Sequence, residues 1–264
     1  MTMRCVGILG GMGPQATVLL MQKVIAATPA TDDAGHIPLI VDQNPQVPSR
    51  IRHLLEGAGE DPGPVLAAMA VRLQRAGALA LAMPCNTAHH YAASIKAATT
   101  VPFIDMVQLS VAQAARLAGK SARVGILASP AVRRVGLFDS ACAAAGLAAA
   151  YATDEVAMLA AIRAIKAGGD LGGARATLAR ASAELLAKGC TVQMIACTEF
   201  SLIPDALAAG VTGFDTLDQL VRGLVAFATG HRPTSNLELE PVPERDRDRP
   251  SHFPPPRSAQ APRP

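Results

Sequence analysis

Short apolar runs alternate with longer amphipathic stretches over the first 230 residues of this chain. The apolar runs predict buried strands, and the stretches between them carry apolar positions at helical spacing. The predicted strands span 6–9, 38–42, 78–83, 123–127 and 191–196, and the predicted helices span 14–27, 62–76, 154–167 and 173–188. Such alternation is typical of parallel βαβ units whose helices cover both faces of a sheet. The pattern therefore predicts an α/β fold with parallel sheets.

Two segments depart from this alternation. Residues 43–50 carry prolines at 45 and 48 and are predicted to form a rigid, exposed loop. Residues 231–264 hold nine prolines, six arginines and five acidic residues, with little periodicity. Such a segment buries too little apolar surface to offset its chain entropy. We predict a disordered, Pro/Arg-rich tail over 231–264.

A weak internal repeat divides the remaining chain. The sequence of residues 6–9 (VGIL) recurs at 124–127, and Gly77 and Gly189 each lie eight positions before a cysteine, Cys85 or Cys197. Matched contexts of this kind indicate duplication. We expect two similar α/β halves related by a pseudo-twofold axis, over 1–106 and 107–230. The helix near 215–230 is a candidate to pack back on the first half.

The duplication places the two cysteines at equivalent strand ends. Ligands of open α/β sheets bind beyond the carboxyl ends of strands, so Cys85 and Cys197 are predicted to oppose each other across one cleft. A thiol, with a reference pKa of about 8.5, can serve as acid or base near neutral pH. Opposed thiols could therefore invert a stereocentre. The alternative is that both are buried small apolar side chains, the usual fate of a free cysteine.

Polar residues follow both cysteines. Asn86, Thr87 and Thr198 lie in predicted loop-to-helix turns, where backbone N–H groups and side chains can hold a carboxylate. Glu199 could polarise a thiol or a substrate amine, or could only charge the first turn of a helix. His89 and His90 point apart on a helix, and His89 is the candidate for a supporting role.

Composition and spacing narrow the functional classes. The net charge of +3 comes from scattered basic residues and gives no indication of nucleic-acid binding. No apolar stretch reaches the roughly 20 residues of a membrane span and no signal peptide is recognisable, so we expect a cytoplasmic protein that binds no membrane. The five cysteines are then expected to be thiols rather than disulfides.

No cofactor or metal is expected. The chain has neither C-x-x-C nor a paired histidine motif, and no phosphate cradle accompanies a lysine. The glycine-rich residues 10–13 lack the spacing of a nucleotide-binding loop and are interpreted as a tight strand-to-helix turn. Met12 and the amides of this turn are candidates for contact with substrate.

Three motifs together resemble the aspartate racemase branch of the aspartate/glutamate racemase superfamily. They are residues 10–17 (GGMGPQAT), 85–89 (CNTAH) and 197–199 (CTE). The resemblance covers roughly residues 4–230. It implies a two-domain, pseudo-symmetric fold, activity without pyridoxal phosphate or metal, and a homodimer.

The resemblance also implies how an acidic side chain is bound. In the family an arginine in a Pro-x-Arg context meets the distal carboxylate, and Arg50 matches that position; a lysine before Ala-Gly assists, and Lys166 matches. The turn after the strand at 123–127 departs from the Thr/Gly-rich turn of the family. Ser129 can still donate a hydrogen bond there, but the departure leaves the identity of the substrate open.

The hypothesis from sequence is a cofactor-independent racemase, an isomerase that moves the Cα proton of aspartate or glutamate between Cys85 and Cys197. Two alternatives stay open. One is another activity of the superfamily: broad-specificity or hydantoin racemisation, maleate isomerisation or a decarboxylation. The other is a non-catalytic amino-acid-binding protein. Arg50 and Lys166 favour an acidic amino acid over a hydantoin.

Overall fold

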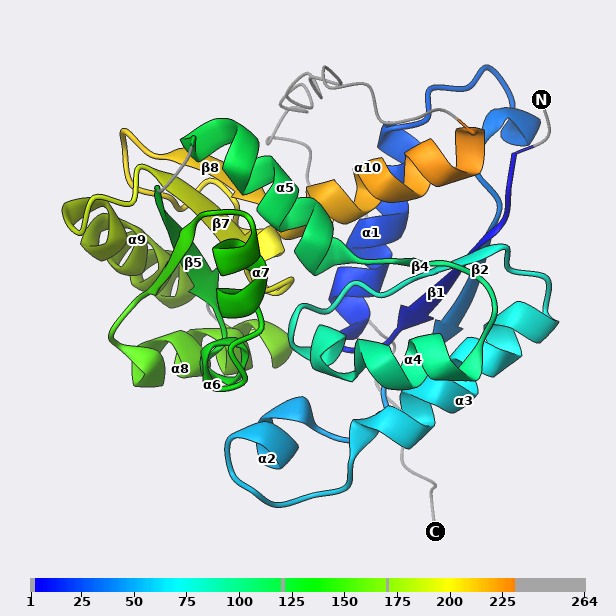
Figure 1. Cartoon of the computed structure of the whole chain (residues 1–264), viewed down its shortest axis with the longest axis horizontal. Helices are drawn as coiled ribbons and strands as arrows, with labels where there is room; N and C mark the ends of the chain where they lie inside the picture. Colours follow the sequence, from blue (N-terminus) through cyan, green and yellow to red (C-terminus); the bar gives the residue numbers. More distant parts are fainter. Residues whose placement is uncertain (1–2, 120–121, 170, 231–264) are drawn as a thin grey trace, which may run out of the picture. The chain divides into compact units, whose positions relative to one another are not determined.

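A computed structural model describes residues 3–119, 122–169 and 171–230 of the chain, all within one compact unit, Met1–Thr234. The disorder predicted for 231–264 falls outside these residues. The described part contains two four-stranded parallel sheets (Figure 1). Within it, no helix is long and apolar enough to span a bilayer.

The first sheet has the strand order β2-β1-β3-β4 and comes from the first half of the chain. Its strands are β1 (Val6–Gly10), β2 (Leu39–Gln43), β3 (Ala80–Ala82) and β4 (Phe103–Ile104). The helices between them are α1 (Pro14–Ala26), η1 (Asp33–Gly35), α2 (Arg50–Leu54), α3 (Pro62–Arg75), η2 (Thr87–Tyr91) and α4 (Ala92–Ala98). Every residue of β1 is buried, as expected for a central strand covered on both faces.

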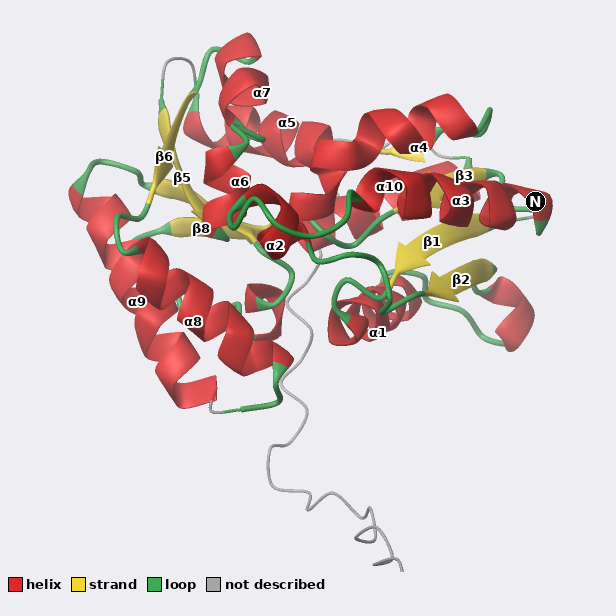
Figure 2. Cartoon of the chain, turned by 90° about the horizontal axis from the view of Figure 1, so that it is seen from below, coloured by secondary structure: helices red, strands yellow, loops and turns green. Residues whose placement is uncertain are grey.

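The second sheet repeats this order as β6-β5-β7-β8. Its strands are β5 (Arg123–Ala128), β6 (Ala148–Tyr151), β7 (Val192–Ala196) and β8 (Thr212–Asp215). Its helices include α6 (Pro130–Arg134), α7 (Asp139–Ala144), α8 (Glu155–Lys166), α9 (Leu171–Ala187) and η3 (Phe200–Leu202). Figure 2 shows α8 and α9 side by side along one face of this sheet. The predicted α/β fold with two similar parallel sheets is confirmed.

The repeated VGIL sequence has a physical basis in the packing of β1 and β5. A Cβ on Gly7 would lie 2.8 Å from the Cβ of Ala78, and a Cβ on Gly125 would lie 2.8 Å from Cγ of Gln193. Both positions also face a leucine of the helix that precedes the cysteine-bearing strand, Leu73 or Leu185. Only glycine lets that helix lie so close to the central strand.

Two helices connect the halves by packing on the sheet of the other half. Helix α5 (Met106–Ala118) follows β4, but its buried residues Val107, Val111 and Ala114 join the core around β5 and β7. Helix α10 (Thr216–Thr229) follows β8, but its leucines join the core formed by β1 and α1. The two helices also contact each other, and α10 packs against α1, which it crosses in Figure 1. Two of the core clusters of the described residues therefore combine a sheet with a helix that follows the other sheet in the chain.

The structure corrects some details of the predicted elements. In the loop 43–50, Val47 is buried in the core of the first half, and Arg50 already begins α2, so the loop is only partly exposed. Strands β4, β6 and β8 were not predicted; their two to four residues carry too little periodicity.

Candidate active site

Cys85 and Cys197 follow the central strands β3 and β7 at their carboxyl ends. Both are buried, with 7% and 5% of their surface exposed. All five cysteines lie within the described residues and are free thiols. The two thiols therefore occupy equivalent places in the two sheets, as the sequence predicts.

A chain of hydrogen bonds links the backbone around one cysteine to that around the other. Asn86 Nδ2 donates to Thr216 Oγ1 over 3.0 Å, and Thr216 Oγ1 donates to the carbonyl oxygen of Ile195 over 2.9 Å. Asn86 adjoins Cys85, and Ile195 lies two residues before Cys197. These bonds are buried, so they fix the two cysteine-bearing segments against the start of α10.

A second link joins the loops that follow β3 and β5. The Thr87 and Ser129 hydroxyl oxygens are 3.2 Å apart, so one donates to the other. Ser129 lies at the N-terminus of α6, and α6 in turn contacts α2, the helix that begins with Arg50. Three of the predicted binding residues are thus connected through short elements of both halves.

Glu199 lies between a thiol and a cation. The Cys197 thiol donates to Glu199 Oε2 over 3.1 Å, and Lys166 Nζ lies 3.2 Å from Glu199 Oε1. Glu199 is buried, whereas Lys166, the last residue of α8, keeps 38% of its side chain exposed. Thr198, between Cys197 and Glu199 in the sequence, is also buried. The segment 197–199 and the end of α8 therefore form one polar cluster.

The pKa of Lys166 shows which charges surround it. Burial alone would lower this pKa, but the carboxylate of Glu199, joined by Cys85 and Cys197 whenever either is ionised, outweighs burial and raises it. Arg50 acts on the same ammonium group in the opposite direction. Both thiols and both predicted side-chain cations therefore lie within one electrostatic neighbourhood.

The Cys197 thiol is held in its protonated form. Its pKa is raised well above the usual value, first by burial and then by the negative charge and hydrogen bond of Glu199; Lys166 opposes the shift without cancelling it. The hydrogen bond is consistent with this direction, because only a protonated sulfur can donate to the carboxylate.

His89 supports Cys85 rather than facing a substrate. Its Nδ1 lies 2.8 Å from the carbonyl oxygen of Cys85, and its Nε2 accepts the backbone N–H of Met106 over 3.2 Å. Burial lowers the pKa of His89, so the neutral imidazole is favoured, with Nδ1–H as donor and Nε2 as acceptor. His90 is exposed. Of the two histidines, only His89 touches the cysteine-bearing segment.

The glycine turn after β1 also reaches the polar cluster. Gly11 has a φ of +94°, and a Cβ there would collide with the backbone of Asn44. A Cβ on Gly13 would meet Glu199 Oε1 at 3.4 Å, so the turn of the first half lies against the carboxylate of the second. The side chain of Met12 is buried in the core cluster that also holds Cys85. Contact of Met12 with a substrate stays a prediction.

Arg50 is oriented by its own loop. Its Nη1 donates to the carbonyl oxygens of Val47 and Pro48, over 3.1 and 2.9 Å. This holds the base of the guanidinium and leaves its other N–H groups as donors for a ligand.

Two positioning residues, Thr216 and Thr17, were missed from the sequence. Thr216 holds Asn86, and Thr17 Oγ1 accepts the backbone N–H of Gly11 over 3.0 Å. A usable signal for Thr216 exists: an aspartate at the junction of strand and helix caps the next helix in both halves, Asp105 just after β4 and Asp215 at the end of β8. Thr17 lies within the glycine motif but had no predicted role.

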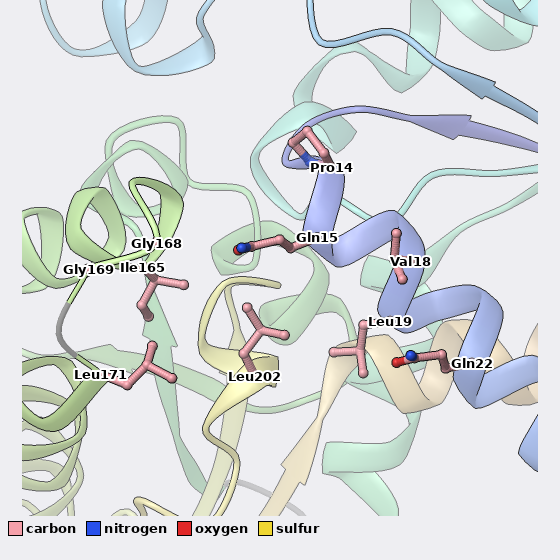
Figure 3. A pocket seen from close by; sticks show the side chains of 10 residues that line it. All are labelled: Pro14, Gln15, Val18, Leu19, Gln22, Ile165, Gly168, Gly169, Leu171 and Leu202. Atoms are coloured by element: carbon pink, nitrogen blue, oxygen red, sulfur yellow. The ribbon is translucent and has the colours of Figure 1, made fainter. Parts of the chain in front are cut away.

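The groove in Figure 3 has a mostly apolar lining. It encloses about 570 Å³ between α1 and the segment that joins α8 to α9. Its side chains are mostly apolar, such as Leu19, Ile165 and Leu202, and Gln15 and Gln22 provide its polar groups. Among the described residues that line it, none carries a charge.

Among the described residues, no group of three or more His, Cys, Asp or Glu side chains is arranged to hold a metal ion. The chemistry that the cluster itself can perform is proton transfer by thiols and binding of anions by cations and hydroxyl groups.

Comparison with known proteins identifies the family. The family model described as Asp/Glu/Hydantoin racemase matches residues 9–224. The broad specificity amino-acid racemase RacX of Bacillus subtilis (strain 168) is 27% identical over 133 residues, which are 46% of this chain and 53% of that protein. The chain thus spans about half the length of this curated relative.

Solved structures share the fold. The aspartate racemase of Picrophilus torridus has a TM-score of 0.76 at 24% identity, covering 86% of this chain and 94% of the other. An aspartate racemase homologue from Pyrococcus horikoshii has a TM-score of 0.65 at 20% identity, covering 86% of this chain and all of the other. The family match extends over most of the described residues, and the chain therefore belongs to the Asp/Glu/Hydantoin racemase family.

Proposed function

We propose that the protein is an amino-acid racemase, an isomerase that transfers the Cα proton between Cys85 and Cys197 without a cofactor. One observation carries the proposal: two buried thiols at equivalent strand ends act on the same ammonium group, that of Lys166. The Asn86–Thr216–Ile195 hydrogen bonds support it, because they hold the two cysteine-bearing segments together.

The reaction needs one thiolate and one thiol. The thiolate removes the Cα proton and becomes a thiol, while the opposite thiol gives its proton to the other face of the carbon and becomes a thiolate. The substrate is inverted, and the enzyme is left with the two protonation states exchanged. The reverse reaction starts from that exchanged state, so one pair of sulfurs serves both enantiomers.

The polar residues stabilise the charge that this step creates. Removing the Cα proton moves negative charge onto the α-carboxylate, which Thr87, Ser129 and Thr198 can stabilise through their hydroxyl groups. Asn86 Oδ1 is buried and accepts no hydrogen bond from the described residues. As an acceptor it suits the α-ammonium group, while the second N–H of the Asn86 amide can still reach the carboxylate.

The substrate that this cluster favours is aspartate, with glutamate as the second candidate. Arg50 and Lys166 provide two cations for one side-chain carboxylate. Lys166 is already paired with Glu199, so the distal carboxylate would share or replace this partner. The likeness to the Picrophilus torridus aspartate racemase agrees with this choice, and that to the Bacillus subtilis broad specificity racemase keeps neutral amino acids within the test.

A homodimer, a cytoplasmic location and a division into halves at residues 106–107 belong to the same proposal. The first two rest on resemblance and on composition. The third is supported by the core clusters, because each half has one cluster built from its own residues alone, although α5, which follows the first sheet, and α10, which follows the second, each join a cluster of the other sheet.

Chiral chromatography tests the proposed function. The full chain is incubated with single enantiomers of Asp, Glu, Ala, Lys and Arg, with and without a pyridoxal phosphate scavenger. We expect inversion of aspartate from either enantiomer, insensitive to the scavenger. If no amino acid is inverted while aspartate still binds, the protein is a binding protein and the proposal is wrong. Inversion of neutral or basic amino acids alone would contradict the assignment of Arg50 and Lys166.

A further inference from the structure

The duplication makes the two cysteines equivalent in position but not in their neighbours. The residue two places after Cys197 is Glu199, whereas the residue two places after Cys85 is Thr87. Thr87 bonds a neutral hydroxyl group, that of Ser129. Glu199 instead accepts a hydrogen bond from the Cys197 thiol over 3.1 Å. Cys197 therefore has the buried carboxylate of Glu199 beside it, whereas the equivalent position after Cys85 holds the hydroxyl group of Thr87.

We propose that Glu199 is a positioning residue that makes the two thiols inequivalent, holding Cys197 as the protonated thiol of the free enzyme. Cys197 is then the resting proton donor, and Cys85 is the resting base. The inference rests on the proposed racemase function. It goes beyond it because a two-thiol mechanism by itself does not say in which form either sulfur waits for substrate.

The geometry supports this assignment through both carboxylate oxygens of Glu199. Oε2 accepts from the thiol, and Oε1 lies 3.2 Å from Lys166 Nζ, against the Gly13 turn. Turning the carboxylate away from Cys197 would disturb its pairing with Lys166. The ion pair with Lys166 therefore holds Glu199 where it accepts the hydrogen bond from the Cys197 thiol.

The other charges around Cys197 do not replace Glu199 in this role. Lys166 favours a thiolate, but it is shared with Glu199 and with Cys85. Arg50 acts on the same group of charges from α2. A thiolate at Cys197 would face the carboxylate of Glu199 across the distance of the present hydrogen bond, which disfavours that form.

The exposures of the two thiols allow a direct comparison of their reactivity. Cys85 and Cys197 are 7% and 5% exposed, so access to a small reagent is nearly equal. Alkylation by iodoacetamide requires the thiolate. We propose to measure the alkylation rate of each cysteine of the full chain between pH 7 and pH 10 by tandem mass spectrometry.

The expected result is a difference in rate and its loss on removing the carboxylate. In the unchanged protein, Cys197 is expected to react at least about tenfold more slowly than Cys85 below pH 9. Glu199→Gln is expected to raise the ratio of the Cys197 rate to the Cys85 rate about tenfold. A neighbouring charge shifts a pKa by about 1 to 3 units, and the lower nucleophilicity of a more acidic thiol offsets about half of the gain.

Two controls separate this role from a structural one. Glu199→Asp keeps a carboxylate and is expected to retain most of the protection of Cys197. Cys142 and Cys190 are fully buried outside the site and report any loosening of the fold, since they react only when it opens. Equal alkylation rates at Cys85 and Cys197 in the unchanged protein would overturn the inference. So would a ratio of the two rates that is the same in Glu199→Gln as in the unchanged protein.

The alkylation rates involve no turnover, so they test Glu199 separately from the proposed function. A second readout belongs to the working enzyme. Because two enantiomers have equal free energy, kcat/KM must be the same in both directions. Inequivalent thiols are therefore visible only if kcat and KM both differ between the two enantiomers, by the same factor. Glu199→Gln is expected to shrink that difference; a difference that persists unchanged contradicts the inference.

Discussion

At the scale of single residues, the site depends on pairs of groups that act on each other. Cys197, Glu199 and Lys166 form a thiol–carboxylate–ammonium series. Arg50 approaches it from α2, held by two carbonyl oxygens of its own loop. The two cations differ in what they already bind: Lys166 is paired with a carboxylate, whereas Arg50 donates to backbone oxygens. Arg50 is therefore the stronger candidate for selecting an acidic substrate.

Arg50→Gln tests this selection. We expect KM for aspartate to rise by about tenfold or more, because a charge-assisted hydrogen bond contributes about 1.5 to 3 kcal/mol. The KM for a neutral amino acid should change much less. Arg52, an exposed arginine on the same short helix, provides the matched control, and Arg52→Gln should leave both unchanged. Equal losses for aspartate and a neutral substrate in Arg50→Gln would argue against a contact with the side-chain carboxylate.

The two cysteines could be predicted from the sequence because each ends a central strand of a repeat, and a strand end is fixed by the fold. The Glu199 hydrogen bond could not, since its direction depends on a rotamer that Lys166 and the Gly13 turn select. Thr216 lies 130 residues from Asn86 in the sequence. No local pattern contains such a contact, although the aspartate repeated just after β4 and at the end of β8 points to the region.

At the scale of elements, the equivalent helices α5 and α10 begin with aspartate caps that carry opposite pKa shifts. Asp215 is buried, and burial followed by the charge of Asp218 raises its pKa to about 7. For Asp105, burial alone would raise the pKa, but the pKa is lowered, and its hydrogen bonds with Lys96 and Gln108 and the charge of Lys96 act in that direction. The two caps should therefore respond to pH in opposite directions.

Asp215→Asn tests the raised pKa. The pKa of Asp215 is higher in the folded chain than in the unfolded chain, where it is near 4, so the protonated carboxyl group stabilises the fold. This contribution is fully present below about pH 4 and is lost as the pH rises to about 7. Asparagine keeps the acceptor for Ser201 and Leu217 and removes the charge. We compare the free energy of unfolding of Asp215→Asn with that of the unchanged protein by denaturant unfolding. As the pH rises from 4.5 to 8, we expect this difference to shift by about 2 to 4 kcal/mol in favour of the variant.

Asp105→Asn is the matched comparison at the other cap. Its lowered pKa gives stability that is present above the unfolded value and is lost as pH falls. This variant should therefore be less stable than the unchanged protein at pH 7 and should approach it below pH 4. The same pH dependence for both variants would contradict opposite environments at the two caps.

The elements that the sequence predicted are those with long, clear periods. Helices α1, α3, α8 and α9 and the buried strands β1 and β7 match the predicted ranges within a few residues. Residues 148–151 of β6 are three alanines and a tyrosine, which suit a helix as well as a strand, so only pairing with β5 decides their conformation.

At the scale of the whole molecule, the exchange of α5 and α10 should make the two halves one cooperative unit. Leu220 of α10 is fully buried in the core of β1 and α1, although α10 follows β8 in the chain. A loss of packing at Leu220 therefore affects both sheets. This coupling holds the two cysteine-bearing strands in a fixed relation, because Thr216 at the start of the same helix bonds to both segments.

Leu220→Ala tests this coupling. We expect a loss of about 2 to 5 kcal/mol in the free energy of unfolding, as for other buried leucines. Hydrogen exchange should accelerate in β7 as much as in β1. Leu79→Ala, at a half-exposed position, is the control and should change stability by less than about 0.5 kcal/mol. Faster exchange confined to the first sheet would show that the halves unfold independently.

The most direct test of the central claim replaces each sulfur in turn. Cys85→Ser and Cys197→Ser are compared with Cys142→Ser, a buried cysteine outside the site, by following the inversion of L- and D-aspartate in deuterated water. Each site variant should lose inversion at least about 100-fold, because each removes one of two proton-transfer groups, while Cys142→Ser keeps it. Inversion at an unchanged rate in either site variant would contradict a mechanism in which both thiols act on one carbon.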